Sequence, residues 1–199
     1  DEINKASDLR EDSLRISIDT KAKVDLCDSS RGGTSRCRKA VKADDHDMGL
    51  KDKLAPFGIL NMMTGLLTII FGVSFETSDF IVDCLEQWWD DNKSQNGHIN
   101  QLVINLDNGP QNSSHRTQFM KRIIEFADKN NLEIVLAYYP PYHSKYNPVE
   151  RCWGILENHW SATLLNTLEI TLAWAKTMTW KGLSPVVKLL ETTYQKGVK

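Results

Sequence analysis

The 199-residue chain has few cysteines, no long apolar run and no large excess of charge of either sign. Its four cysteines are widely spaced and form no Cys-x-x-Cys pair, so neither a zinc ribbon nor a redox motif is indicated. The densest apolar stretch, FGILNMMTGLLTIIFGV, is interrupted by asparagine and glycine, which favours two strands and a turn over a membrane span. The opening residues, DEINKASDLREDS, are polar and do not predict a secretory signal. We therefore expect reduced thiols, a cytoplasmic location and no membrane partner.

The charge balance bears on nucleic-acid binding. A net charge of −2 argues against a protein that binds nucleic acid over its whole surface. An acidic active site can, however, offset the charge of basic patches elsewhere. The composition, with 41% hydrophobic residues, fits one globular domain over residues 1–199. We expect a flexible basic and polar loop over residues 28–53, which is either solvated or a phosphate-binding arm. Its basic residues include Arg31, Arg36, Arg38, Lys39 and Lys42.

Two strand-like segments far apart in the chain share one template. LRISID runs from Leu14 to Asp19, and LVINLD runs from Leu102 to Asp107. Alternate residues of a strand face opposite sides, so in each segment the large apolar residues share one face and the final aspartate takes the other. If the two strands are neighbours in one sheet, the two carboxylates converge.

The order of the remaining elements suggests how the two strands are arranged. Apolar and turn patterns predict three strands, then helix, strand, helix, strand and helix, with further helices near 168–177 and 185–195. Antiparallel hairpins followed by βαβ units predict an α/β fold, with a mixed five-stranded sheet and helices on both faces. Ribonuclease H-like folds have this order and place the fourth strand beside the first.

A third acid, Glu150, stands near the start of a predicted helix in SKYNPVERCW. Simpler explanations exist for each acid. A variant of the capping box is formed by Asn147, Pro148 and Glu150. Asp107 suits a turn, and Asp19 could be the solvent-exposed end of a strand. The conjunction of all three, in the order that one fold requires, favours a shared site. Magnesium prefers such oxygen ligands, and two ions can serve phosphodiester chemistry.

Three motifs carry a resemblance to a known family. ISIDTKAKV, LVINLDNGPQNSS and YYPPYHSKYNPVERCW resemble the segments that surround the three acids in DDE-type transposases of bacterial insertion sequences. The similarity is to the mariner-related, Rhodopirellula-type branch, and it covers about residues 3–181. The N-terminal helix-turn-helix region that such transposases use to find their element ends is not evident in this sequence.

The resemblance implies DNA cleavage and strand transfer. Asp19, Asp107 and Glu150 would be the catalytic residues and would hold two Mg²⁺ ions, with Mn²⁺ as a substitute. The partners would be element-end and target DNA and a second copy in a homodimer, in a nucleoid-associated bacterial location. The residues expected to contact DNA are Lys145, His143, Arg151, Arg36, Arg38 and Lys39.

Two other functions remain open at this point. A ribonuclease H-like nuclease that cuts without joining needs the same triad, and an assay for strand joining would separate it. A decayed, non-catalytic domain that binds or dimerises would depend more on exposed aromatic side chains than on the acids, because fold alone does not settle function.

Overall fold

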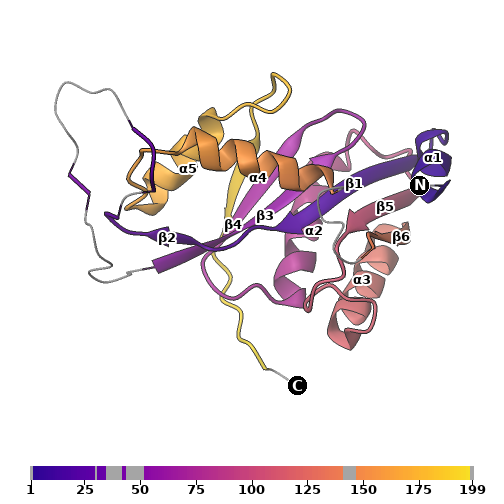
Figure 1. The fold of residues 1–199 in the computed structure, drawn as a ribbon. Helices are drawn as coiled ribbons and strands as arrows, with labels where there is room; N and C mark the ends of the chain where they lie inside the picture. The colour runs from indigo at the N-terminus through magenta and orange to yellow at the C-terminus, as the bar shows by residue number, and fades with distance from the viewer. Residues whose placement is uncertain (1, 30, 35–41, 44–51, 141–146, 198–199) are drawn as a thin grey trace.

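A seven-stranded mixed sheet forms the centre of the computed structural model, which describes residues 2–29, 31–34, 42–43, 52–140 and 147–197 (Figure 1). Its strands are β1 (Ser13–Thr20), β2 (Val24–Leu26), β3 (Asp52–Asn61), β4 (Leu67–Gly72), β5 (Gln101–Leu106), β6 (Glu133–Tyr138) and β7 (Val186–Leu190). The order is β6-β5-β1-β3-β4-β7, with β2 paired to β3. β3 runs antiparallel to β1 and β4, while β5, β6 and β7 join their neighbours in parallel.

Helices cover both faces of the sheet, as the sequence predicts (Figure 1). They are α1 (Glu2–Asp8), α2 (Ser78–Asn92), α3 (Thr117–Asn130), α4 (Pro148–His159) and α5 (Leu168–Thr177). Side chains of α2 and α3 belong to one hydrophobic core, and those of α4 and α5 belong to a second core on the opposite face. Among the described residues, none of these helices has the length and apolar content that a membrane span requires.

The alternation in LRISID predicts the two faces of β1 correctly. Leu14, Ile16 and Ile18 are at most 2% exposed and lie in the core that contains α2 and α3. The intervening Ser17 contacts α4 through the backbone N–H of Val149, on the other side of the sheet. The pleat of β1 therefore directs its polar side chains toward the helix that carries Glu150.

The C-terminal segment corrects the predicted architecture. The sequence pattern predicts a helix over residues 185–195, but β7 lies there instead and pairs in parallel with the edge of β4. The consecutive Val186 and Val187 suit a pleated strand, and the exposed edge of β4 offers backbone partners that no local pattern records. With β2, this strand brings the sheet from the expected five strands to seven.

Smaller differences concern helix starts and the loop. The sequence predicts a helix capped by Ser113 or Ser114, but α3 begins later, at Thr117, because Ser113 closes a turn with Arg116 instead. Helix α1 has no counterpart in the sequence prediction. Of the basic loop expected over 28–53, residues 35–41 and 44–51 lie outside the described residues, and its end belongs to β3.

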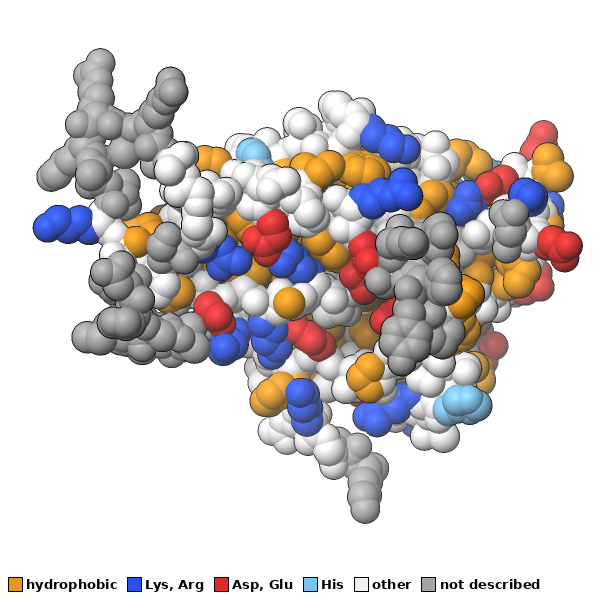
Figure 2. Space-filling view, in the orientation of Figure 1, with side chains coloured by type: hydrophobic (Ala, Val, Ile, Leu, Met, Phe, Trp, Pro, Cys, Tyr) orange, Lys and Arg blue, Asp and Glu red, His pale blue; other side chains and the backbone are white. Residues whose placement is uncertain are grey.

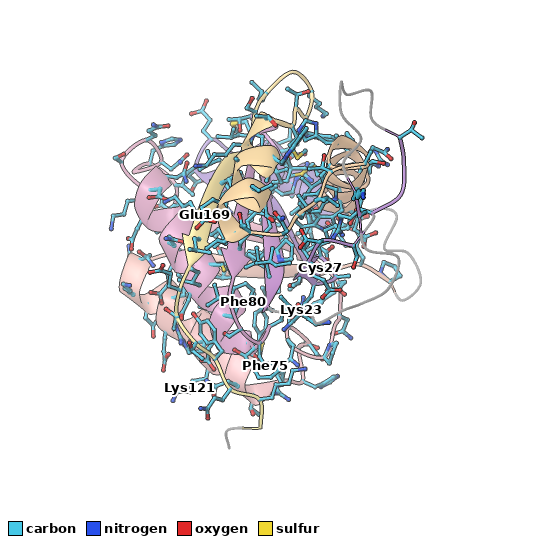
Figure 3. All side chains as sticks on the ribbon, turned by 90° about the vertical axis from the view of Figure 1, so that its left-hand side faces the viewer. Lys23, Cys27, Phe75, Phe80, Lys121 and Glu169 are labelled. Atoms are coloured by element: carbon cyan, nitrogen blue, oxygen red, sulfur yellow. The ribbon has the colours of Figure 1, made fainter. Side chains whose placement is uncertain are left out.

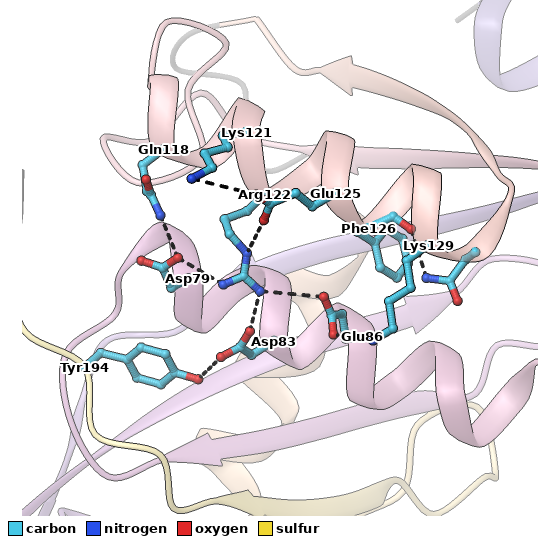
Figure 4. Close-up of polar contacts among 11 residues, drawn as sticks. Asp79, Asp83, Glu86, Gln118, Lys121, Arg122, Glu125, Phe126, Lys129 and Tyr194 are labelled. Carbon is cyan, nitrogen blue, oxygen red and sulfur yellow. Dashed lines mark hydrogen bonds and ion pairs between the residues drawn. The ribbon is translucent and has the colours of Figure 1, made fainter.

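One arginine joins α2 to α3 (Figure 4). Arg122 on α3 donates hydrogen bonds to Asp79 (3.1 Å) and Asp83 (2.7 Å) on α2, and its guanidinium lies 3.6 Å from Glu86. The C-terminal segment joins the same group, because the hydroxyl of Tyr194 donates to Asp83 at 2.5 Å. These contacts join α2, α3 and the C-terminal segment to one another.

Candidate active site

The two strand-end aspartates lie side by side. β1 and β5 pair in parallel with Ser17 opposite Asn105, so the same register continued two residues further brings Asp19 level with Asp107. Asp19 is the penultimate residue of β1, and Asp107 directly follows β5. The two strands are therefore neighbours in the sheet, as the paired templates predict, and both aspartates line one cavity.

The carboxylate of Asp19 accepts a hydrogen bond from a tryptophan and lies near other acidic side chains. The indole Nε1–H of Trp153 donates a 2.8 Å hydrogen bond to Oδ2 of Asp19. Burial raises the pKa of Asp19 to about 7, the Trp153 hydrogen bond opposes this rise, and the negative charges of Asp107 and Glu150 add to it. A carboxyl group with this pKa is only partly ionised at neutral pH, unless a cation compensates the surrounding charge.

Asp107 both shapes a turn and faces the site. Its Oδ1 accepts a 2.8 Å hydrogen bond from Nδ2 of the buried Asn112. The backbone carbonyl oxygen of Asn112 accepts a hydrogen bond from the hydroxyl of Tyr138. A Cβ at Gly109 would lie 3.0 Å from Asn112 Oδ1 and 3.2 Å from Asp107 Oδ2, so a larger residue here would crowd both side chains. Asp107 can therefore stabilise the turn and still act as a metal ligand.

The start of α4 corrects one expectation for the third acid. Asn147 occupies the N-cap position, but its side chain makes no capping bond. It is fully buried, donates from Nδ2 to the carbonyl oxygen of Ile18 at 3.0 Å, and hydrogen-bonds Ser17 Oγ. Ser17 Oγ in turn accepts from the backbone N–H of Val149 at 3.3 Å. Asn147 therefore fastens α4 to β1, and Glu150 stands in the first turn of that helix.

A small cavity opens at the two aspartates. It has a volume of about 180 Å³, and its lining includes Asp19, Thr20, Asp107, Asn112 and a fourth acid, Glu76. Oε1 of Glu76 is buried and has no hydrogen-bond partner among the described residues. Burial raises the pKa of Glu76, while Lys23 and Lys196 lower it. Sequence reasoning missed Glu76, because an acid just before a helix cap carries no signal of its own.

The chemistry of these side chains fits a hard divalent cation. Asp19, Asp107 and Glu76 present oxygen donors at or in the cavity, and Glu150 lies close enough to raise the pKa of Asp19. In the described part of the chain, no three acidic, histidine or cysteine side chains already stand close enough together to hold an ion. The donor types suit magnesium rather than zinc, and all three described cysteines are free thiols.

Basic side chains near the cavity differ from those that the sequence suggested. Arg151 is exposed in the first turn of α4, whereas Arg36, Arg38, Lys39, His143 and Lys145 lie outside the described residues. The structure adds an aromatic–lysine group beside Glu76, part of which is labelled in Figure 3. The ammonium groups of Lys23 and Lys196 lie 5.0 and 5.2 Å from the ring centroid of Phe75. Phe75 is 45% exposed, so this group lies at the protein surface.

Solved structures define the class of this fold. The Mos1 transposase paired-end complex with left transposon end matches with a TM-score of 0.55 and 9% identity, over 87% of this chain and 49% of that chain. The Mos1 mariner paired end complex with Mn matches with a TM-score of 0.54, again at 9% identity and the same coverage. At this identity the likeness shows the fold, an α/β ribonuclease H-like fold. The chain spans about half the length of the Mos1 chains it matches.

The sequence itself places the chain in a family. The profile of the family described as "Rhodopirellula transposase DDE domain" matches residues 1–199, and the chain belongs to this family of DDE transposase domains. The resemblance noted in the three motifs is thereby confirmed. Comparison with curated proteins gives no match.

Proposed function

We propose that this domain catalyses metal-dependent cleavage of a DNA phosphodiester bond and transfer of the new 3′ end to target DNA. The observation that carries the proposal is the pairing of β1 with β5, which brings Asp19 level with Asp107 beside one cavity. Family membership supplies the reaction class. The Mos1 structures contain transposon-end DNA and Mn, which supports DNA and a divalent ion as the partners here.

Asp19, Asp107 and Glu150 have distinct positions in this proposal. Asp19 and Asp107 come from rigid strand ends, while Glu150 comes from α4, which Asn147 fastens to β1. The three acids would hold two divalent ions, with Mg²⁺ as the physiological metal and Mn²⁺ as a substitute. When bound, such ions supply charge neutralisation for the attacking and leaving oxygens of an in-line displacement. The protein contributes preorganised carboxylates, whose mutual repulsion is relieved by the cation.

The DNA strand would approach across the basic side chains beside the cavity. Lys23 and Lys196 lie over Phe75, and the next residue along the chain, Glu76, lines the cavity. Arg151 and the basic residues of the 28–53 loop would add phosphate contacts. In Figure 2, acidic and basic side chains of the described residues are interspersed on the face shown, so binding would depend on local contacts rather than on a broad basic surface.

Replacement of Asp107 tests the proposal. Asp107→Asn keeps an oxygen that can accept from Asn112, so the turn should survive, but the carboxylate charge is lost. We expect the metal-free variant to melt at the parent temperature or higher, because a repulsive charge beside Asp19 is gone. Added Mg²⁺ should then raise the melting temperature of the parent more than that of the variant, since only ligand-competent protein gains by mass action.

Two activity assays complete the test. Mg²⁺-dependent nicking of plasmid DNA should be lost in Asp107→Asn, and joining of an oligonucleotide with a free 3′-hydroxyl to the plasmid should be lost with it. Nicking without joining by the parent would favour the nuclease alternative. Equal Mg²⁺ shifts and equal nicking in parent and variant would reduce Asp107 to a turn residue and refute the proposal.

A further inference from the structure

The tryptophan that hydrogen-bonds Asp19 comes from the helix of the third acid. Trp153 follows Glu150 by one helical turn, so both side chains leave the same side of α4. Trp153 is 7% exposed, and its indole N–H reaches Oδ2 of Asp19 across the interface between helix and sheet. One side chain therefore connects the strand of the first acid to the helix of the third.

A glycine on the neighbouring strand makes room for this contact. Gly58 of β3 is the register partner of Asp19 on β1. A Cβ at position 58 would lie 2.6 Å from Cζ2 of Trp153 and 2.8 Å from Cγ2 of Val149, closer than real contacts allow. The indole ring thus lies directly on the β3 backbone, and any larger residue at position 58 would push it away from Asp19.

We propose that Trp153 is a positioning residue for the metal-binding carboxylates, seated on Gly58 and acting through Asp19. This inference rests on the proposed function. The indole takes one oxygen of Asp19, fixes the rotation of the carboxylate, and leaves the other oxygen for a cation. Because Trp153 and Glu150 share α4, the same contact sets the distance between the first and third acids. Hydrogen-bond partners of metal ligands orient those ligands, and losing one typically lowers metal affinity about 10- to 100-fold.

The chain contains a matched control on the same helix interface. Trp160, at the end of α4, is fully buried and donates its Nε1–H to Oε2 of Glu157 at 2.7 Å. This contact also joins a tryptophan to a carboxylate, but Glu157 is paired with Lys21 and takes no part in the cavity. Trp153→Phe and Trp160→Phe each remove one indole donor while keeping an aromatic ring. Only the first should disturb metal binding.

Indole NMR signals provide a readout other than activity. The protein has six tryptophans, and comparison with Trp153→Phe and Trp160→Phe assigns the two indole N–H signals in ¹⁵N-labelled protein. Low concentrations of Mn²⁺ should broaden the Trp153 signal before that of Trp160. In Mg²⁺ titrations, Trp153→Phe and Gly58→Ala should each weaken binding about 10- to 100-fold, while Trp160→Phe should leave it within twofold. Melting temperatures of all variants report any general loss of folding.

The outcomes separate this inference from the function it rests on. If the parent binds Mg²⁺, Asp19→Asn loses that binding and Trp153→Phe matches the parent, the positioning role is refuted and the proposed function stands. If neither the parent nor Asp19→Asn responds to Mg²⁺ or Mn²⁺, the proposed function fails and the positioning role fails with it. Equal losses in Trp153→Phe and Trp160→Phe would also refute the inference, because the effect would then come from packing.

Discussion

Nδ2 of Asn147 donates a 3.0 Å hydrogen bond to the carbonyl oxygen of Ile18, the residue that precedes Asp19. The same side chain hydrogen-bonds Ser17, so a single buried amide contacts β1 on the two residues before the first acid. The side chain of this asparagine, in the NPVE motif, therefore makes no capping bond, although the residue occupies the N-cap position. It joins the helix of Glu150 to the strand of Asp19, and this explains why an amide, with a donor and an acceptor, suits position 147.

Replacement of Asn147 should destabilise the domain. Asn147→Ala leaves the buried hydroxyl of Ser17 and the Ile18 carbonyl without this partner, which costs about 1–3 kcal/mol for each unsatisfied group. We expect a lower melting temperature and a weaker response to Mg²⁺, because α4 is then free to shift. Thermal melts with and without Mg²⁺ measure both. An unchanged melting temperature would contradict the role assigned to this amide, and Asn166→Ala, at an exposed hydrogen bond to Asp28, is the control.

The metal-free protein should lose stability as pH rises through the range in which Asp19 titrates. Its pKa is about 7 in the folded state against an ordinary value of 3.8, so between these values the folded state binds more protons than the unfolded state. The free energy of unfolding therefore falls with rising pH and levels off above the folded pKa. Asp19→Asn should remove this contribution and melt higher than the parent at pH 8. The check is a series of thermal melts of both proteins at several pH values, in the presence of chelator. If the two melting temperatures change in parallel with pH, the raised pKa of Asp19 is contradicted.

The sequence predicted the part of the site that depends on strand periodicity. LRISID and LVINLD place Asp19 and Asp107 on the same side of two strands, and the element order makes those strands neighbours. Glu76, by contrast, reaches the cavity from the segment between β4 and α2, and no periodicity marks it. β7 was missed for a related reason, since its strand form depends on the free edge of β4. Such contacts depend on tertiary packing, which local patterns do not encode.

The contact between α2 and α3 should depend on Arg122. Arg122→Met leaves Asp79 and Asp83 without their cation, while Glu86 keeps its ion pair with Lys129. A hydrogen bond to a charged group contributes about 2 kcal/mol. We expect the melting temperature to fall by roughly 4–8 °C for a domain of this size, with a smaller fall at high salt. Lys121→Met is the control, because that side chain is 69% exposed and its nearest oxygen on Glu125 is 3.8 Å away. Equal melting temperatures for the two variants would show that the network of Figure 4 contributes little.

The salt dependence of DNA binding tests the basic group beside the cavity. Lys23→Ala and Lys196→Ala each remove an ammonium that lies over Phe75. If each lysine neutralises one phosphate of duplex DNA, the slope of log affinity against log salt should become shallower by about 0.9 for each variant. The loss should be similar for unrelated DNA sequences, since phosphate contacts carry no sequence information. Fluorescence anisotropy with a labelled duplex, at several salt concentrations, measures both quantities.

Lys93→Ala is the matched control for this prediction. Lys93 is an exposed lysine at the C-cap of α2, whereas Phe75 and Glu76 precede the N-terminus of that helix. The 15 residues of α2 separate the two positions by roughly 22 Å. Removal of Lys93 changes the net charge by the same amount as removal of Lys23, so a general effect of charge would alter the slope equally in both variants. A slope that changes only in Lys23→Ala and Lys196→Ala would place a DNA strand beside the carboxylate cavity; equal changes in all three variants would remove that group from the DNA interface.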